Sequence, residues 1–394
     1  MKSIIRKNAV GGLVGFFLIS LLAVGVNAEP VVKEWRIQCI NVITGPYAFF
    51  GEAIAFTMDQ AVKDINNAGG IAGKPVAIDY YDEAMDPAKT VTELNKFIDK
   101  SLVIIGPISA NVSPAAMPIY TRHKAFAIPP FLSPFVAEQY QPWMITGIPP
   151  MQKMPILPIK EWLKRNPGMK TVVQFTWPLD PLWIAEANSQ RAVMEEAGIK
   201  VFDVECSAGV DMGSAVVKAM DRKPEGYTIN VGPVETAKIV KELDKRGVKD
   251  KGKIIIFANA DDAALFELGA GYLDGCYNWG SKDNNSSSPR WQSLKKRYIA
   301  KYPGSRSISA VVPICYDMVY LVKLAIENTG ATGNAAKLQE ERAKLMSYSR
   351  NIKNFPGVLY DYDFVNGFPQ WRVYLLQVKN NELIRVEEYL NLKW

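Results

Sequence analysis

The chain alternates short apolar segments with helix-like segments, and this alternation restricts the possible folds more than any other feature. Each apolar segment is rich in β-branched residues and ends at Gly, Pro or small polar residues, as buried strands do. Strands are expected at residues 35–42, 76–80, 102–105 and 125–128 and, after a proline-rich passage, at 171–175, 201–205, 227–231 and 253–257. Strands separated by helices predict two parallel sheets, each covered by helices, and therefore an α/β fold.

The chain departs from this alternation after Pro289. Helices are expected at residues 291–302 and 310–328, followed by strands at 358–360, 371–378 and 383–389. A late return to helices and then to strands indicates that the chain passes between the two sheet-based lobes more than once.

Residues 1–28 have the pattern of a secretory signal peptide. Lys2, Arg6 and Lys7 form a positive start, an uncharged apolar stretch follows, and Val26 to Ala28 offers small residues for cleavage after Ala28. An uncleaved membrane anchor is the alternative, but the segment is short for a membrane span. We therefore expect an exported, soluble protein.

Charge and cysteine content exclude some classes of protein. The formal net charge is +6, and three of the positive charges lie in the expected signal peptide, so the charge gives no argument for nucleic acid binding. The four cysteines, Cys39, Cys206, Cys276 and Cys315, are scattered without metal-binding spacing. Cys39 and Cys315 lie in apolar surroundings typical of buried thiols, and the sequence assigns no disulfide.

The segment Leu102 to Ser113 is the first candidate for a binding site. A buried strand ends at Gly106-Pro107, and small polar residues then lead into a helix-like run. This arrangement predicts free backbone N–H groups at the carboxyl end of the strand, where an anion is favoured. In open α/β sheets, ligands bind at this edge.

The sequence offers no set of residues typical of an enzyme. His123 is the single histidine and stands between two basic residues, and no serine elbow, metal-binding motif or dinucleotide-binding motif is present. We expect no catalytic residues, no metal and no cofactor. A secreted hydrolase that pairs Asp180 or Asp261 with a serine is kept as the least favoured alternative.

Aromatic, hydroxyl, amide and acidic residues instead gather just after the expected strands. They are Thr44, Tyr47, Phe49, Phe50, Ser109, Asn111, Phe131, Ser133, Trp177, Asp180, Trp183, Asp261 and Asp262. Apolar walls with a few polar groups are typical of a ligand-binding pocket rather than of a reaction site.

Four segments carry a resemblance to a known family. They are Thr44 to Gly51 (TGPYAFFG), Ala61 to Gly73 (AVKDINNAGGIAG), Tyr81 to Ala88 (YDEAMDPA) and Ile104 to Pro107 (IIGP). In this combination the chain resembles the periplasmic solute-binding proteins of branched-chain amino acid type, which serve ABC transporters. The resemblance is strong over residues 35–135 and continues more weakly to about residue 390.

The resemblance implies two Rossmann-like lobes joined by three hinge crossings, the type I periplasmic binding fold. The crossings are expected near residues 145–148, 277–280 and 355–358. Lobe 1 then comprises residues 29–146 and 280–355, and lobe 2 comprises residues 147–279 and 356–394.

The resemblance also implies roles for residues of the cleft between the lobes. The loops at 109–111 and 131–133 hold the carboxylate of the ligand, so Ser109, Ala110, Asn111, Phe131 and Ser133 are expected contacts. Trp183 supplies an aromatic wall from the second lobe, Asp261 accepts an ammonium group, and Phe50 lines the side-chain pocket.

The sequence departs from the family pattern at the expected site. Ala110 replaces a serine, Phe131 replaces a small residue, and Pro114 and Pro118 disturb the helix that should start there. These changes favour a bulkier, flatter acid stacked between Phe131 and Trp183 over an α-amino acid.

Together these observations predict a monomeric periplasmic protein that captures a small carboxylate-bearing ligand and delivers it to the membrane permease of an ABC transporter. A ligand sensor on the same fold is the main alternative, and the sequence does not separate the two.

Overall fold

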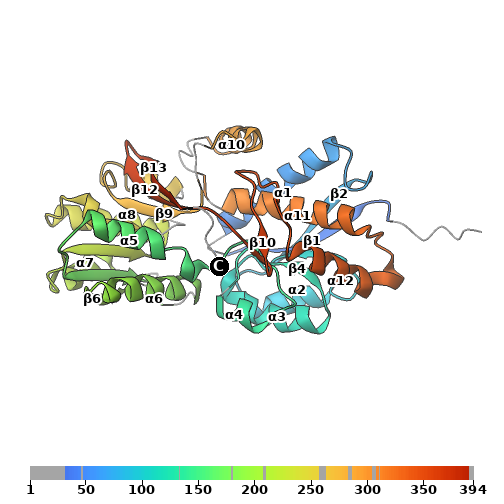
Figure 1. Cartoon of the computed structure of the whole chain (residues 1–394), viewed down its shortest axis with the longest axis horizontal. Helices are drawn as coiled ribbons and strands as arrows, with labels where there is room; N and C mark the ends of the chain where they lie inside the picture. Colours follow the sequence, from blue (N-terminus) through green and yellow to red (C-terminus); the bar gives the residue numbers. More distant parts are fainter. Residues whose placement is uncertain are drawn as a thin grey trace, which may run out of the picture.

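The computed structural model describes residues 32–45, 48–132, 134–178, 181–206, 210–256, 263–282, 286–303, 308–309 and 311–389. These residues form two lobes that lie along the long axis of the molecule, each built on its own β-sheet (Figure 1). The expected signal peptide at residues 1–28 lies outside the described residues. Among the helices that the structure describes, none is long and apolar enough to cross a membrane.

The sheet of the first lobe is parallel, with the strand order β2-β1-β3-β4. Its strands are β1 (Trp35–Asn41), β2 (Val76–Asp82), β3 (Val103–Ile105) and β4 (Phe126–Ile128). The helices of this lobe are α1 (Ala48–Asn67), α2 (Pro87–Asn95), α3 (Ser113–Arg122), α4 (Pro134–Gln139), α10 (Pro289–Lys301), α11 (Val311–Thr329) and α12 (Leu338–Ser349).

Helices cover both faces of this first sheet because its strands are apolar on both sides. Successive side chains of a strand point to opposite faces, so Ile37 and Cys39 of β1 join the core beneath α1 and α11. Ile40 packs on the other face with Leu94 of α2 and Ala116 of α3. Figure 1 shows α1 and α11 above the sheet and α2, α3 and α4 below it.

The second lobe has a mixed sheet with the order β13-β12-β9-β8-β7-β5-β6. The strands β5 (Thr171–Thr176), β6 (Lys200–Glu205), β7 (Gly226–Asn230) and β8 (Ile254–Ile256) are parallel, as expected. β9 (Tyr277–Gly280) also runs parallel in this sheet, so the residues expected to form the second crossing are a strand of the second lobe. The hairpin of β12 (Val373–Lys379) and β13 (Glu382–Tyr389) adds two strands, and β12 pairs antiparallel with β9. The helices are α5 (Ile156–Arg165), α6 (Pro181–Glu196), α7 (Met212–Met220), α8 (Pro233–Lys245) and α9 (Ala263–Leu268).

The last crossing between the lobes differs from the expectation of residues 355–358. The short hairpin β10 (Phe364–Val365) and β11 (Phe368–Pro369) still lies on the first lobe, where the Gly367 carbonyl accepts a hydrogen bond from the Thr146 N–H (3.0 Å). Phe368 packs against the apolar cluster of that lobe. The chain therefore enters the second sheet only at β12, and the expected strand at 358–360 is absent from the described structure.

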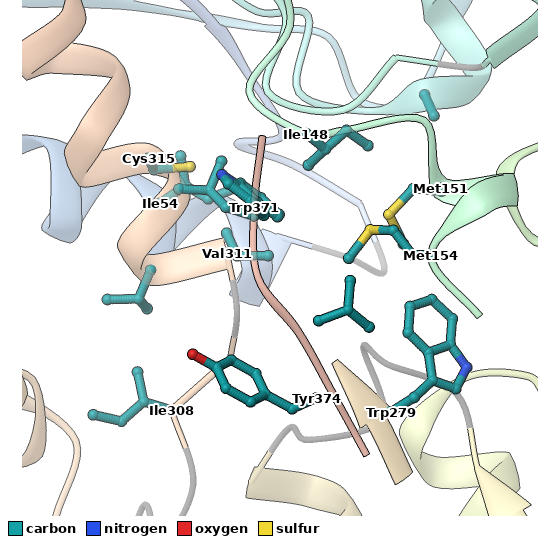
Figure 2. Packing of buried hydrophobic residues seen from close by; sticks show 14 of the residues in the cluster. Ile54, Ile148, Met151, Met154, Trp279, Ile308, Val311, Cys315, Trp371 and Tyr374 are labelled. Carbon is teal, nitrogen blue, oxygen red and sulfur yellow. The ribbon is translucent and has the colours of Figure 1, made fainter. Parts of the chain in front are cut away.

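Apolar side chains from both lobes meet where the crossings run. Figure 2 shows Ile54 and Val311 of the first lobe near Trp371, with Met151 and Trp279 on the side of the second lobe. All of these side chains belong to one continuous buried cluster. The junction is therefore packed like a core, while the two sheets remain separate.

The four cysteines are free, buried thiols, which confirms the expectation for Cys39 and Cys315. Burial raises the pKa of the Cys276 thiol to about 12, so the neutral thiol is the form present at neutral pH.

A buried arginine attaches α12 to the rest of the first lobe. The guanidinium of Arg342 is fully buried and donates hydrogen bonds to the carbonyl oxygens of Ile98 (2.5 Å), Ser101 (3.1 Å) and His123 (3.0 Å). These carbonyls follow the ends of α2 and α3, where a positive charge is favourable.

We expect Arg342→Met to lower the free energy of unfolding by about 3 kcal/mol or more, because it leaves buried carbonyl oxygens without donors. Urea unfolding followed by tryptophan fluorescence measures this change. Lys344→Met is the matched control, since Lys344 lies on the same helix in an exposed ion pair with Glu340, and it should cost less than about 0.5 kcal/mol. Equal losses in the two variants would contradict the role given to Arg342.

Candidate functional site

A cavity of about 390 Å³ lies between the two lobes and is lined by both. The volume is in the range of small-molecule sites. The first lobe contributes Val42, Phe49, Phe50, Ile54, Met85, Ile108, Ser109, Ala110, Asn111, Phe131, Ser309 and Val311. The second lobe contributes Trp177, Trp183, Val231, Gly232, Pro233, Val234 and Glu235.

Most of the lining residues follow the carboxyl ends of parallel strands. Val42 follows β1, Met85 follows β2 and Phe131 follows β4, while Trp177 and Val231 follow β5 and β7 of the second lobe. The carboxyl ends of parallel strands meet at one edge of a sheet. The cavity thus forms where the corresponding edges of the two sheets face each other.

The structure brings together six of the eight residues that the sequence predicted for the site. Phe50, Ser109, Ala110, Asn111, Phe131 and Trp183 line this cavity. Ser133 and Asp261 lie outside the described residues, as do Tyr47, Asp180 and Asp262. That these residues contact a ligand remains a prediction.

The sequence analysis missed several lining residues. Trp177 was noted only as an aromatic residue after a strand, and Gly232 and Glu235 were not proposed for the site. Pro233 in the first turn of α8 and Glu235 two residues later are typical of a helix start. This helix begins shortly after the end of β7, which is the signal that could have placed both residues at the cavity. Ser309 carried no such indication, since it comes from a segment far along the chain from the other residues of the first lobe.

The loop after β3 reaches the cavity through a close approach of the backbone. Gly106 has φ +110°, and a Cβ there would lie 2.4 Å from the carbonyl oxygen of Ile40, so a glycine is required. The Tyr120 hydroxyl donates a hydrogen bond to the Gly106 carbonyl (2.9 Å). The loop is therefore fixed before it reaches Ser109.

The carboxylate of Glu83, which is fully buried beneath this loop, fixes the next part of it. Its two oxygens accept hydrogen bonds from the backbone N–H groups of Ile108 (3.0 Å) and Ser109 (2.9 Å). Burial raises the pKa of Glu83 to about 7, although hydrogen bonds from the Ser109 hydroxyl and from these N–H groups oppose the shift. The free N–H groups expected at this strand end therefore do not include those of Ile108 and Ser109, because Glu83 already accepts hydrogen bonds from them.

The N–H groups of Ala110 and Asn111 remain as donors. They open the 3₁₀ turn η1 (Ala110–Val112), where no earlier helical carbonyl is available, and they have no acceptor among the described residues. The α-helix itself starts later, at Ser113, and α3 runs through Pro118 without ending there. The disturbance expected from the prolines thus takes the form of a 3₁₀ entry to α3.

Asp82, the neighbour of Glu83, holds a second loop at the cavity. One of its oxygens accepts hydrogen bonds from the N–H groups of Ile43 (2.8 Å) and Thr44 (3.2 Å), which follow β1. Burial alone would raise the pKa of Asp82, but hydrogen bonds from Lys89 and Thr44 outweigh this effect and hold the pKa well below its usual range. The end of β2 therefore anchors the loops after β1 and β3 together.

Aromatic rings form much of the cavity wall. Trp177 and Trp183 pack edge to face, with ring centroids 4.9 Å apart and an angle of 63° between the planes. On the opposite lobe the rings of Phe49 and Phe50 are 4.4 Å apart. Among the described residues of the lining, no Lys, Arg or His is present, and Glu235 carries the one formal charge.

This two-lobed fold with a cavity between the lobes defines a class of ligand-binding proteins. A sequence model of the family described as periplasmic binding protein matches residues 34–382, and the chain belongs to this family. The predicted fold class is thereby confirmed.

Similar proteins agree with this assignment. Leu/Ile/Val-binding protein homolog 1 of Brucella abortus (strain 2308) is 34% identical over 129 residues, which are 32% of this chain and 32% of that relative. The match thus spans about a third of the relative's length.

Two solved structures share the fold over nearly the whole chain. A leucine-binding protein from Thermotoga maritima MSB8 has a TM-score of 0.76 at 22% identity and covers 90% of this chain and 99% of its own. A solute-binding protein of an ABC transporter from R. palustris, in complex with 4-hydroxybenzoate, has a TM-score of 0.76 at 18% identity, with 91% and 97% covered.

The raised pKa of Glu83 predicts a pH dependence of stability. A carboxyl group that binds its proton more tightly in the folded protein stabilises it fully below its unfolded pKa, near 4.5, and this contribution is lost as the pH rises to about 7. We therefore expect Glu83→Gln to gain stability relative to the wild type between about pH 5 and about pH 8, by at most about 3 kcal/mol.

Urea unfolding of both proteins across that range measures the difference. Glu52→Gln is the control, because Glu52 lies on the surface of the same lobe and should leave the wild-type pH profile unchanged. A constant difference between wild type and Glu83→Gln at every pH contradicts the expectation.

Proposed function

We propose that the protein captures a small carboxylate-bearing ligand, an aromatic acid or an amino acid, and delivers it to the membrane permease of an ABC transporter. The observation that carries the proposal is the cavity between the lobes, whose lining combines aromatic rings with Ala110 and Asn111 at the start of η1. Family membership supports the transport role, because the family is that of periplasmic binding proteins.

The aromatic walls favour a flat ligand. Phe131 enters the cavity from the first lobe and Trp183 from the second, so a ring between the lobes has an aromatic partner on either side. The solute-binding protein from R. palustris, which shares the fold, is in complex with 4-hydroxybenzoate. An aromatic acid is therefore our first candidate.

We place the carboxylate of such a ligand at the start of η1. Ala110 and Asn111 offer N–H donors there, and Ser133 remains an expected contact. Because the described lining holds no cation, hydrogen bonds rather than an ion pair must compensate the ligand's charge.

An amino acid is the second candidate. The relative from Brucella abortus is a Leu/Ile/Val-binding protein homolog, and Asp261 is the residue expected to accept the ammonium group. The two candidates share the carboxylate and differ at the other end of the ligand.

The remaining parts of the proposal concern location and partners. We propose that residues 1–28 direct export to the periplasm, that the protein acts as a monomer, and that it is a binding protein rather than an enzyme. The same fold also suits a ligand sensor, which would signal to a membrane receptor instead of a permease.

A thermal-shift screen of amino acids and aromatic acids tests the function. A ligand present at 100 times its dissociation constant adds about 2.7 kcal/mol to the stability of the folded protein, which gives a clear rise in Tm. Small-angle scattering should then show compaction, because closure of the lobes accompanies binding in a hinged protein. The proposal is overturned if none of the acids in the screen stabilises the protein.

We expect Trp183→Ala to weaken binding of the best acid about tenfold or more, because it removes one aromatic wall of the cavity. Calorimetric titration measures the change. Phe202→Ala is the matched control, since Phe202 lies on β6 beneath Lys200 and Arg222 and away from the cavity, and it should leave the affinity unchanged. Unchanged affinity in Trp183→Ala would remove this tryptophan from the site.

A further inference from the structure

Two residues that line the cavity carry polar atoms that the protein does not satisfy. The side-chain oxygen of Asn111 and the indole N–H of Trp177 are shielded from solvent and have no hydrogen-bond partner among the described residues. The orientation of the Asn111 amide is set by its nitrogen, which donates to the Met85 carbonyl (3.2 Å). Buried polar groups are normally paired, so these two residues mark a polar part of a lining that is otherwise mostly apolar.

Glu235 adds a charged acceptor on the wall of the second lobe. It lies in the first turn of α8, is half-buried, and its carboxylate has no hydrogen-bond or ion-pair partner in the described part of the chain. The start of a helix is a favourable place for a negative charge. The carboxylate is therefore stable at the cavity without a cation.

A glycine leaves room for this carboxylate. A Cβ on Gly232 would lie 2.6 Å from an oxygen of Glu235 and 3.8 Å from the ring of Trp183. The carboxylate thus folds over Gly232, beside the indole ring that we propose contacts the ligand. A side chain at position 232 would displace Glu235 from this place.

The position of Glu235 dictates how an acidic ligand can bind. Two like charges repel, and the repulsion grows in a cavity that excludes water. A ligand carboxylate is therefore directed to the N–H groups of the first lobe, and the other end of the ligand faces Glu235. That end must carry a hydrogen-bond donor, because otherwise the carboxylate of Glu235 is buried by the ligand without a partner.

We propose that Glu235 is a specificity-determining residue that accepts a hydrogen bond from a hydroxyl or ammonium group on the ligand. It therefore selects aromatic acids that carry such a donor over counterparts that carry hydrogen or a methyl group at the same position. This inference rests on the proposed function, since it takes the carboxylate-bearing ligand as given. Glu235 belongs to neither of the loops that the family resemblance assigns to the ligand carboxylate.

The test compares ligands of equal size with and without a donor. Calorimetric titration of the full mature chain uses the three isomers of hydroxybenzoate against the three isomers of methylbenzoate, with aminomethylbenzoates as the ammonium arm. The variants are Glu235→Leu and Glu235→Gln. Glu242→Gln is the control, because Glu242 lies on the same helix in an ion pair with Lys245 and does not line the cavity.

We expect the wild type and Glu242→Gln to prefer one donor-bearing isomer at least about tenfold over its methyl counterpart, since a charged acceptor is left unpaired by the methyl group. Glu235→Leu should bind the donor-bearing acid more weakly and the methyl acid more tightly, so the two affinities move in opposite directions. Glu235→Gln keeps an acceptor without charge and should show a smaller preference than the wild type. The arm that binds better, hydroxyl or ammonium, identifies the donor.

The inference is overturned, and the proposed function left intact, if Glu235→Leu changes the affinities for the donor-bearing acid and the methyl acid equally or leaves both unchanged. The inference is also overturned if Glu235→Leu is too unstable to titrate and Glu235→Gln keeps the full wild-type preference. If the wild type binds none of these acids and no other carboxylate, the proposed function fails and the inference fails with it.

Discussion

The buried carboxylate of Glu83 fixes the loop after β3, and the geometry of the first-lobe wall depends on that contact. Asp82 beside it fixes the loop after β1, so a single strand end positions both loops. Two adjacent residues at the end of β2 hold these loops. The register of β1 with β2 and β3 therefore sets the position of one loop relative to the other. This gives a physical reason for the acidic pair within the YDEAMDPA segment.

The same contact determines which backbone N–H groups of the loop can bind an anion. Glu83 uses the N–H groups of Ile108 and Ser109, which leaves those of Ala110 and Asn111 for a ligand. With aromatic rings around these donors and no cation in the described lining, the recognition proposed here depends on hydrogen bonds and ring contacts. Among the described lining residues the single charge is that of Glu235 on the other lobe, so the two walls differ in electrostatic character.

The alternation of strands and helices predicted the sheets well, and it predicted part of the site for the same reason. Phe50, Ser109 and Phe131 follow different strands, yet they line one cavity because parallel strands end at a common edge. The last crossing, which the resemblance implies at residues 355–358, comes later in the chain because the hairpin of β10 and β11 stays on the first lobe. Its hydrogen bond to Thr146 and the packing of Phe368, which keep it on the first lobe, join residues more than two hundred positions apart.

The sequence by itself determined the α/β class, the two halves and the strand ends that carry the aromatic residues, because these follow from local periodicity and turn chemistry. Only the tertiary structure decided which polar atoms at those ends are still available. The acceptor for Ile108 and Ser109 comes from another strand end, and Ser309 and Glu235 reach the cavity from elements remote in the chain. Hydrogen-bond pairing and burial depend on neighbours in space, and a pattern along one segment does not contain them.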